Sequence, residues 1–145
     1  MERLNFAAAS PGAYKAMGGL EQYVNDCSIE PGLLKLVKLR SSQINGCAFC
    51  VDMHAMAAGK SGETERRLYA LPVWRESPLF TPRERAALAW TELLTNLPSG
   101  TVGEQDYAAL QLHFDERGMV DLTVAINAIN GWNRLAVAFA KQIPA

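Results

Sequence analysis

The sequence predicts an all-α protein of six or seven helices. Apolar residues recur at three- and four-residue steps along most of the chain, which is the spacing of one helix face. No run of β-branched residues alternates with polar residues between turn signals, so no strand is expected. The length of 145 residues, with 49% apolar and 20% charged residues, suits one globular domain. We therefore expect a single helical domain over residues 1–145.

Three helices are expected in the first part of the chain. The first follows a stripe of apolar residues at helical spacing, although Gly18 and Gly19 weaken its centre. A second helix begins at Pro31, a residue that suits the first helical position, and runs through Ile44. Asn45-Gly46 then ends this helix, and a third helix is expected from Cys47 to about Lys60. The stripe of the first helix comprises Tyr14, Met17, Leu20, Val24 and Cys27.

The remaining helices carry clear start or stop signals. A short helix over residues 63–71 is expected to stop at Pro72. Thr81-Pro82-Arg83-Glu84 reads as a capping box and begins a helix that ends before Pro98. Another helix is expected over residues 104–114. The last one, about 119–141, is apolar nearly all round, so it is either central or buried against a second subunit. Self-association into a homo-oligomer is therefore expected.

Charge and hydropathy exclude several classes of partner. The net charge is −1, which favours neither nucleic acid nor an anionic membrane. The densest basic group, Lys35, Lys38 and Arg40, is interpreted as a solvated helix face. The longest apolar stretch, 122–143, is interrupted by asparagines and basic residues that a membrane span would not tolerate.

The compartment and the cofactor classes follow from what the sequence lacks. The first five residues show no apolar secretory signal, and three cysteines do not form the framework of a secreted protein. A cytoplasmic protein is expected. Neither a G-x-G-x-x-G after a strand nor a P-loop occurs, so no cofactor is predicted.

The chemistry-bearing feature is a pair of cysteines in a CxxC motif, Cys47 and Cys50, followed by His54. At about 100° per residue, a helix places all three side chains within roughly 60° of one another. Cys50 and His54 are i,i+4 neighbours and can touch. The helix start favours a thiolate at Cys47, whereas His54 can accept the proton of Cys50. A sulfenic acid on one thiol can condense with the other to a disulfide, which suits a peroxidase or a disulfide reductase.

Competing interpretations of the motif are a pair of inert buried cysteines and a zinc site. Zinc would need a fourth ligand such as Cys27 or His113, yet structural zinc sites usually draw on two such pairs. Cys27 is better explained as a core residue and His113 as a surface or packing residue. A thioredoxin-like protein is disfavoured because no βαβ pattern surrounds the motif.

The segment Ser42-Gln43-Ile44-Asn45-Gly46-Cys47-Ala48-Phe49-Cys50-Val51-Asp52-Met53-His54 resembles the AhpD-like alkylhydroperoxidases of the carboxymuconolactone decarboxylase superfamily. Flanking segments over 36–40, 81–89 and 130–134 extend the resemblance to about residues 11–140. The resemblance implies an all-helical fold that forms higher oligomers, with the CxxC motif at a helix start near subunit contacts. It also implies a thiol-dependent peroxidase that reduces hydrogen peroxide or organic hydroperoxides.

The family's roles carry over to the matching residues. Cys50 would attack the peroxide, Cys47 would resolve the sulfenic acid and meet the reductant, and His54 would be the base in a proton relay. The reductant would be a protein dithiol, such as a lipoyl domain or a thioredoxin-like protein. The decarboxylases of the superfamily do not depend on this CxxC motif.

The chain departs from the family pattern at two positions. Members with the full relay carry a glutamate twelve residues before the first cysteine, where this chain has Lys35. Some carry a histidine directly before the second cysteine, where this chain has Phe49. Glu21 is the candidate replacement because it flanks the apolar stripe of the first helix and could reach inward; a solvated glutamate is the alternative. The alternative functions are a dithiol–disulfide oxidoreductase and a redox sensor, each with little peroxidase activity.

Overall fold

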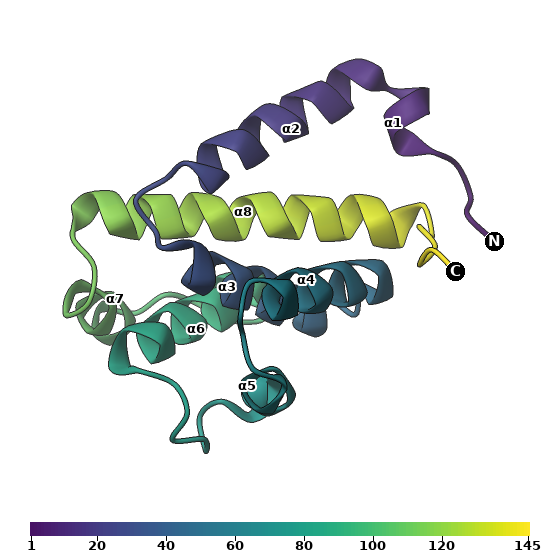
Figure 1. Ribbon diagram of the computed structural model, residues 1–145. Coiled ribbons are helices and arrows are strands. Elements are labelled where there is room, and N and C mark those ends of the chain that lie inside the picture. The colour runs from purple at the N-terminus through teal and green to yellow at the C-terminus, as the bar shows by residue number, and fades with distance from the viewer.

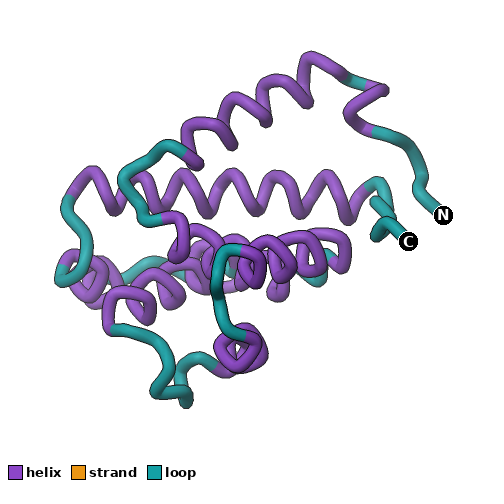
Figure 2. The backbone as a smooth tube through the Cα atoms, in the orientation of Figure 1, coloured by secondary structure: helices purple, strands orange, loops and turns teal.

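The computed structural model describes all residues, 1–145, and contains helices and connecting loops but no strand (Figures 1 and 2). The all-α prediction is confirmed. The elements in chain order are α1 (Phe6–Ala9), α2 (Pro11–Asn25), α3 (Pro31–Ile44), α4 (Ala48–Lys60), α5 (Glu65–Ala70), the 3₁₀ turn η1 (Leu71–Val73), α6 (Pro82–Thr95), the 3₁₀ turn η2 (Leu97–Ser99), α7 (Glu104–Gln111) and α8 (Glu116–Ala138).

Helix α8 is the centre of the arrangement. It contacts α2 on one side and α3, α4, α6 and α7 on the other. Figure 1 shows α1 and α2 above α8, with the remaining helices below it. The apolar character of the last helix is thus explained within one chain, by its central position. Self-association stays a prediction.

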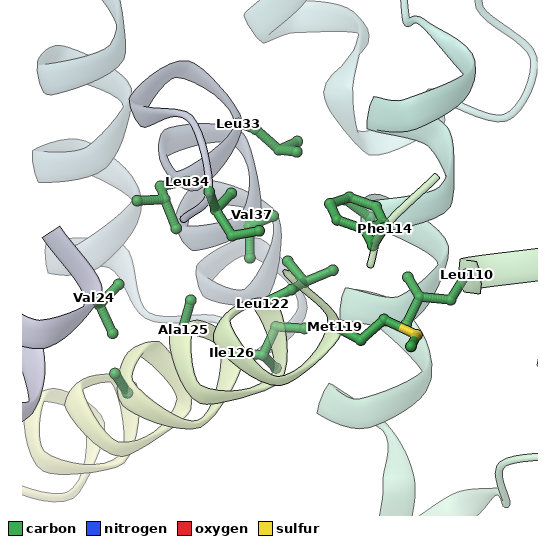
Figure 3. Packing of buried hydrophobic residues seen from close by; sticks show 13 residues of the cluster. Val24, Leu33, Leu34, Val37, Leu110, Phe114, Met119, Leu122, Ala125 and Ile126 are labelled. Carbon is green, nitrogen blue, oxygen red and sulfur yellow. The ribbon is translucent and has the colours of Figure 1, made fainter. Parts of the chain in front are cut away.

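The main hydrophobic core lies where α2, α3, α6 and α7 meet α8. Its fully buried members include Val24, Val37, Ala87, Leu122 and Ala125. Figure 3 shows side chains of α2, α3 and α8 converging there, with Leu110 and Phe114 closing one side.

A second, smaller core packs the other side of α3 against α6 and η1, and Trp74 is its largest buried member. Because both cores pack against α3, the positions of its C-terminal end and of the turn that follows it are fixed.

Local signals placed most helix boundaries correctly. Pro31 opens α3, and Thr81 and Glu84 form the expected reciprocal capping box of α6. The short α-helix ends at Ala70, before Pro72 as expected, and the 3₁₀ turn η1 continues through the proline, which is tolerated in a first turn. The short helix α1 was not expected.

The interpretation of the basic group on α3 as a solvated face was wrong. Lys38 is only 7% exposed and forms an ion pair with Glu21 of α2. Arg40 is half-buried and pairs with Glu92 of α6. With neighbours on most of its sides, α3 has little surface left for water, so Lys38 and Arg40 pair with carboxylates of adjacent helices.

No helix combines the length and the apolar character that crossing a bilayer requires.

Candidate active site

The turn that precedes α4 fixes the first cysteine. Gly46 has φ +65°, a left-handed conformation that glycine adopts without steric cost. The amide of Asn45 donates hydrogen bonds to the side-chain oxygens of Asn130 and Asn133 on α8, each at 2.9 Å. These bonds attach the turn to the central helix, and Cys47 follows as the N-cap residue of α4. The expected position of the first thiol at a helix start is therefore confirmed.

The two cysteines form a disulfide in this structure, between Cys47 and Cys50. The backbone N–H of Cys50 donates to the Sγ atom of Cys47 at 3.2 Å, so the sulfur itself caps the helix. Each cysteine is only 2% exposed. After reduction, a thiolate at Cys47 would receive the same N–H bond together with the favourable field of the helix start.

A cavity of about 430 Å³ lies beside the disulfide and is lined by Cys50, His54 and Glu21, but not by Cys47. The rest of its wall is mainly apolar and aromatic, and it comes from α1, α2, α4 and α8. These wall residues include Phe6, Tyr14, Phe49, Met53, Trp132 and Ala136. A cavity of this size falls in the range of small-molecule sites. Cys50, the second cysteine of the motif, is thus the one that lines the cavity.

Glu21 points inward from α2, as its place beside the apolar stripe suggested. One of its carboxylate oxygens pairs with the ammonium group of Lys38, which also donates to Oδ1 of Asn25 at 3.3 Å. The other oxygen accepts the indole N–H of Trp132 at 3.1 Å. A carboxylate therefore reaches the cavity from a different helix than the one that carries the cysteines.

His54 lines the same cavity and is largely buried. Burial, followed by the positive charge of Lys38, lowers its pKa from 6.5 to about 4, although the negative charge of Glu21 acts in the opposite direction. Its imidazole is consequently neutral at physiological pH, which leaves a ring nitrogen able to accept a proton.

The other residues considered from sequence lie elsewhere. Cys27 is half-buried against the main core, in line with its interpretation as a packing residue. Lys35, at the position of the family's glutamate, is half-buried on α3 and does not line the cavity. No group of three or more His, Cys, Asp or Glu side chains is arranged to hold a metal ion.

Sequence reasoning missed Lys38, Trp132 and Lys141 as members of this region. Lys38 had been assigned to solvent, and the other two lie about 80 or more positions from the cysteines. For Trp132 the sequence offered one signal, its place in the segment 130–134 that resembles the family. For Trp132 and Lys141 a second signal was their place within or just after a helix that is apolar nearly all round, where a polar or aromatic residue must face something specific.

The fold and the motif agree with known proteins. The model of the carboxymuconolactone decarboxylase family matches residues 11–93. The chain belongs to this family. YdfG of Bacillus subtilis (strain 168) is 41% identical over 141 residues, which are 97% of this chain and 96% of YdfG. YnjA of Escherichia coli (strain K12) is 34% identical over 119 residues, 81% of this chain and 63% of YnjA.

Solved structures place the chain among the AhpD-like members of the carboxymuconolactone decarboxylase family. ATU0492 from Agrobacterium tumefaciens, a protein of unknown function proposed to be an antioxidant defence protein AhpD, is 44% identical, with a TM-score of 0.97 over 100% of this chain and 99% of that protein. The debrominase Bmp8 shares the fold at 22% identity and a TM-score of 0.85, covering 95% of this chain and 74% of Bmp8. Since a debrominase has this fold, the fold alone does not define the reaction.

Proposed function

We propose that the protein is a thiol-dependent peroxidase of the AhpD-like type, which reduces hydrogen peroxide or organic hydroperoxides. The observation that carries this proposal is the cavity that Cys50, His54 and Glu21 line together, whereas Cys47 does not line it. A peroxide in the cavity would meet one sulfur, a neutral base and a carboxylate together. This is the set of groups that thiol oxidation by a peroxide needs.

The reaction begins on the reduced dithiol. The Cys50 thiol gives its proton to His54, and the thiolate attacks the terminal oxygen of the hydroperoxide. The O–O bond breaks, the alkoxide leaves as the alcohol after taking up a proton, and Cys50 becomes a sulfenic acid. The Cys47 sulfur then attacks the Cys50 sulfur, an S–S bond forms and water leaves. Two electrons have passed from the two thiols to the peroxide, and the product is the disulfide seen here.

Glu21 serves in this proposal as the replacement for the family's relay glutamate. A histidine with a pKa of about 4 holds a proton poorly, so the proton moves on to the leaving alkoxide, which is a far stronger base. The Glu21 carboxylate lines the same cavity and is kept in place by Lys38 and Trp132. It is therefore the group in the cavity that can relay this proton, and its negative charge favours the protonated form of His54.

The cycle closes when an external dithiol reduces the disulfide, and a protein dithiol such as a lipoyl domain or a thioredoxin-like protein remains our proposal. Both cysteines are only 2% exposed, and the cavity reaches Cys50 rather than Cys47. The expected contact of Cys47 with the reductant therefore needs movement of the turn at Gly46 or of the first turn of α4.

The test is the oxidation of reduced protein by a few equivalents of hydrogen peroxide or cumene hydroperoxide, followed by mass spectrometry. We expect a loss of two hydrogens that maps to Cys47 and Cys50, much faster than the oxidation of free cysteine. Cys50→Ser should abolish the reaction, and Cys27→Ser is the matched control that should retain it. Oxidation at the rate of an ordinary thiol would refute the peroxidase and favour dithiol–disulfide exchange or redox sensing.

A further inference from the structure

One charged side chain that lines the cavity, Lys141, has no part in the proposed peroxidase chemistry. Lys141 follows α8 and lines the cavity together with Cys50 and His54. Its Nζ atom lies 5.2 Å from the ring centre of Phe6 and 5.0 Å from that of Phe49. The ammonium group is thus held between two aromatic rings at the wall of the cavity.

The charge of Lys141 is not balanced by a neighbouring carboxylate. None of the ion pairs in the molecule involves it. The negative charge of Glu21 in the same cavity is already met by Lys38, and its second oxygen accepts the indole N–H of Trp132. His54 is neutral at physiological pH. The cavity therefore carries one positive charge that the protein leaves uncompensated, and this favours an anionic ligand.

The backbone conformation at the end of α8 determines the position of Lys141. Ala140 has φ +53°, a left-handed conformation in which glycine is usual at the end of a helix. The N–H of Lys141 then donates to the carbonyl of Ala136 at 2.9 Å, which closes the last turn of α8. An alanine in this conformation is uncommon, and the turn brings the chain back over the cavity.

The remaining wall suits an apolar body. Phe6, Tyr14, Met53 and Trp132 offer aromatic and sulfur-bearing surfaces to the cavity that Lys141 and Cys50 also line. Such a wall favours a hydrocarbon or aromatic ring over water alone. A substrate that fills the site would thus combine an apolar body, a peroxide at one end and a negative charge at the other.

We propose that the physiological substrate class is organic hydroperoxides that carry a carboxylate, and that Lys141 binds this carboxylate while the peroxide group lies at Cys50. The inference rests on the proposed peroxidase function and names the substrate class of the same cavity. Lys141 is a specificity-determining residue here, since it touches the substrate away from the reacting atoms.

The first experiment compares two hydroperoxides that differ by one charge: cumene hydroperoxide and its 4-carboxylate derivative. The rate constant for disulfide formation in the reduced protein should be about tenfold greater for the carboxylate at low ionic strength. The preference should decline as salt is added. Equal rate constants in the wild-type protein would overturn the proposal.

Three variants assign the preference to its residue. Lys141→Met keeps most of the apolar stem and should bring the tenfold ratio to about one, whereas Lys141→Arg should preserve it. Lys60→Met, which removes an exposed lysine at the end of α4, is the matched control and should leave the ratio at ten. If Lys141→Met slowed both substrates equally, Lys141 would assist the thiol and the proposal would be wrong. An unchanged ratio would mean that Lys141 only packs on the rings.

A second measurement needs no peroxide chemistry. Binding of 4-isopropylbenzoate and of 4-isopropylbenzyl alcohol to the disulfide form can be followed by tryptophan fluorescence, because Trp132 lines the cavity. The benzoate should bind about tenfold more tightly, and Lys141→Met should remove this difference. Lys141-dependent benzoate binding without peroxide reactivity would overturn the peroxidase and keep the anion site. Peroxidase activity without the binding difference would overturn the anion site alone.

Discussion

Two carboxylates of this molecule have nearly the same partners and different surroundings. Glu21 on α2 pairs with Lys38 of α3 and accepts the indole N–H of Trp132. Glu92 on α6 pairs with Arg40 of α3 and accepts the indole N–H of Trp74 at 2.7 Å. Their side chains are similarly covered, with 25% and 19% of the side chain exposed.

The difference lies in what else each carboxylate meets. Glu92 has a third partner, Arg75 at 3.0 Å, so its oxygens are fully used in joining α6 to α3 and to the segment after η1. Glu21 has no arginine partner, and it lines the cavity that contains Cys50 and His54. The same pair of partners thus stabilises a junction between helices at one place and holds a carboxylate beside reactive groups at the other.

The largest expected effect that separates the two carboxylates is on catalysis. Glu21→Gln should slow the oxidation of reduced protein by cumene hydroperoxide by about 10²-fold, the lower end of what a general acid–base group contributes. Glu92→Gln is the matched control and should change this rate little. The measurement is the second-order rate constant, with the pH dependence of Cys50 alkylation recorded for both variants.

An unchanged pH dependence of thiol alkylation in Glu21→Gln would remove Glu21 from the relay. If both variants lost activity and melted early, the loss would reflect folding. Circular dichroism and thermal unfolding of each variant make that distinction.

The next effect concerns the histidine that shares the cavity with Glu21. The pKa of His54 is lowered to about 4 in the folded protein. Between pH 6.5 and 4, His54 is therefore protonated in the unfolded chain but largely neutral in the folded protein. The unfolding free energy should therefore fall by about 2 kcal/mol more between pH 7.5 and 4.5 in the wild-type protein than in His54→Gln. Urea unfolding of the disulfide form measures this, and parallel curves for the two proteins would contradict it.

A smaller effect is expected at the structural carboxylate. Burial alone would raise the pKa of Glu92, but the hydrogen bonds from Trp74, Arg40 and Arg75 lower it below 4.5. Glu92 thus contributes stability above pH 4.5 that is lost as the pH falls through its lowered value. Glu92→Gln should cost about 1–2 kcal/mol at pH 7, and the cost should shrink toward pH 3.

The control for Glu92 is Glu30→Gln, which removes an exposed pair with Arg83 and should cost about 1 kcal/mol or less. Equal costs for the two substitutions in urea unfolding would mean that burial of Glu92 adds nothing.

The smallest expected change is in the pKa of His54. Lys38 lowers the pKa of His54, so Lys38→Met should raise that pKa above about 4. Arg40→Met removes the corresponding cation beside Glu92 and should leave the pKa of His54 as it is. An NMR titration of the His54 imidazole distinguishes the two variants, and an equal shift in both would show that the cations do not act locally.

The features that the sequence predicted correctly depend on residues that are close together in the chain. The capping box at Thr81, the break at Gly46 and the spacing of Cys47, Cys50 and His54 depend on neighbours within one or two helical turns. The family resemblance extended this to about residues 11–140, and it is confirmed by the family model over residues 11–93 and by relatives that match nearly the whole chain.

The features that were missed depend on contacts between distant segments. The ion pair of Lys38 joins residues 17 positions apart, and the bond of Trp132 to Glu21 spans 111 positions. A helical wheel places Glu21 beside an apolar stripe, but it does not show which helix crosses there. The interpretation of Lys38 as solvated failed for that reason, since charge alone does not reveal a buried partner.

The cavity is completed by the two ends of the described chain. Arg3 donates its backbone N–H to the carbonyl of Phe139 at 2.9 Å and its guanidinium to that of Ala138 at 2.8 Å. This joins the segment with Phe6 to the segment with Lys141. Terminal segments open at lower free energy than a packed core. Substitutions there can therefore change which molecules fit beside Cys50 while the helices that hold the thiols stay intact.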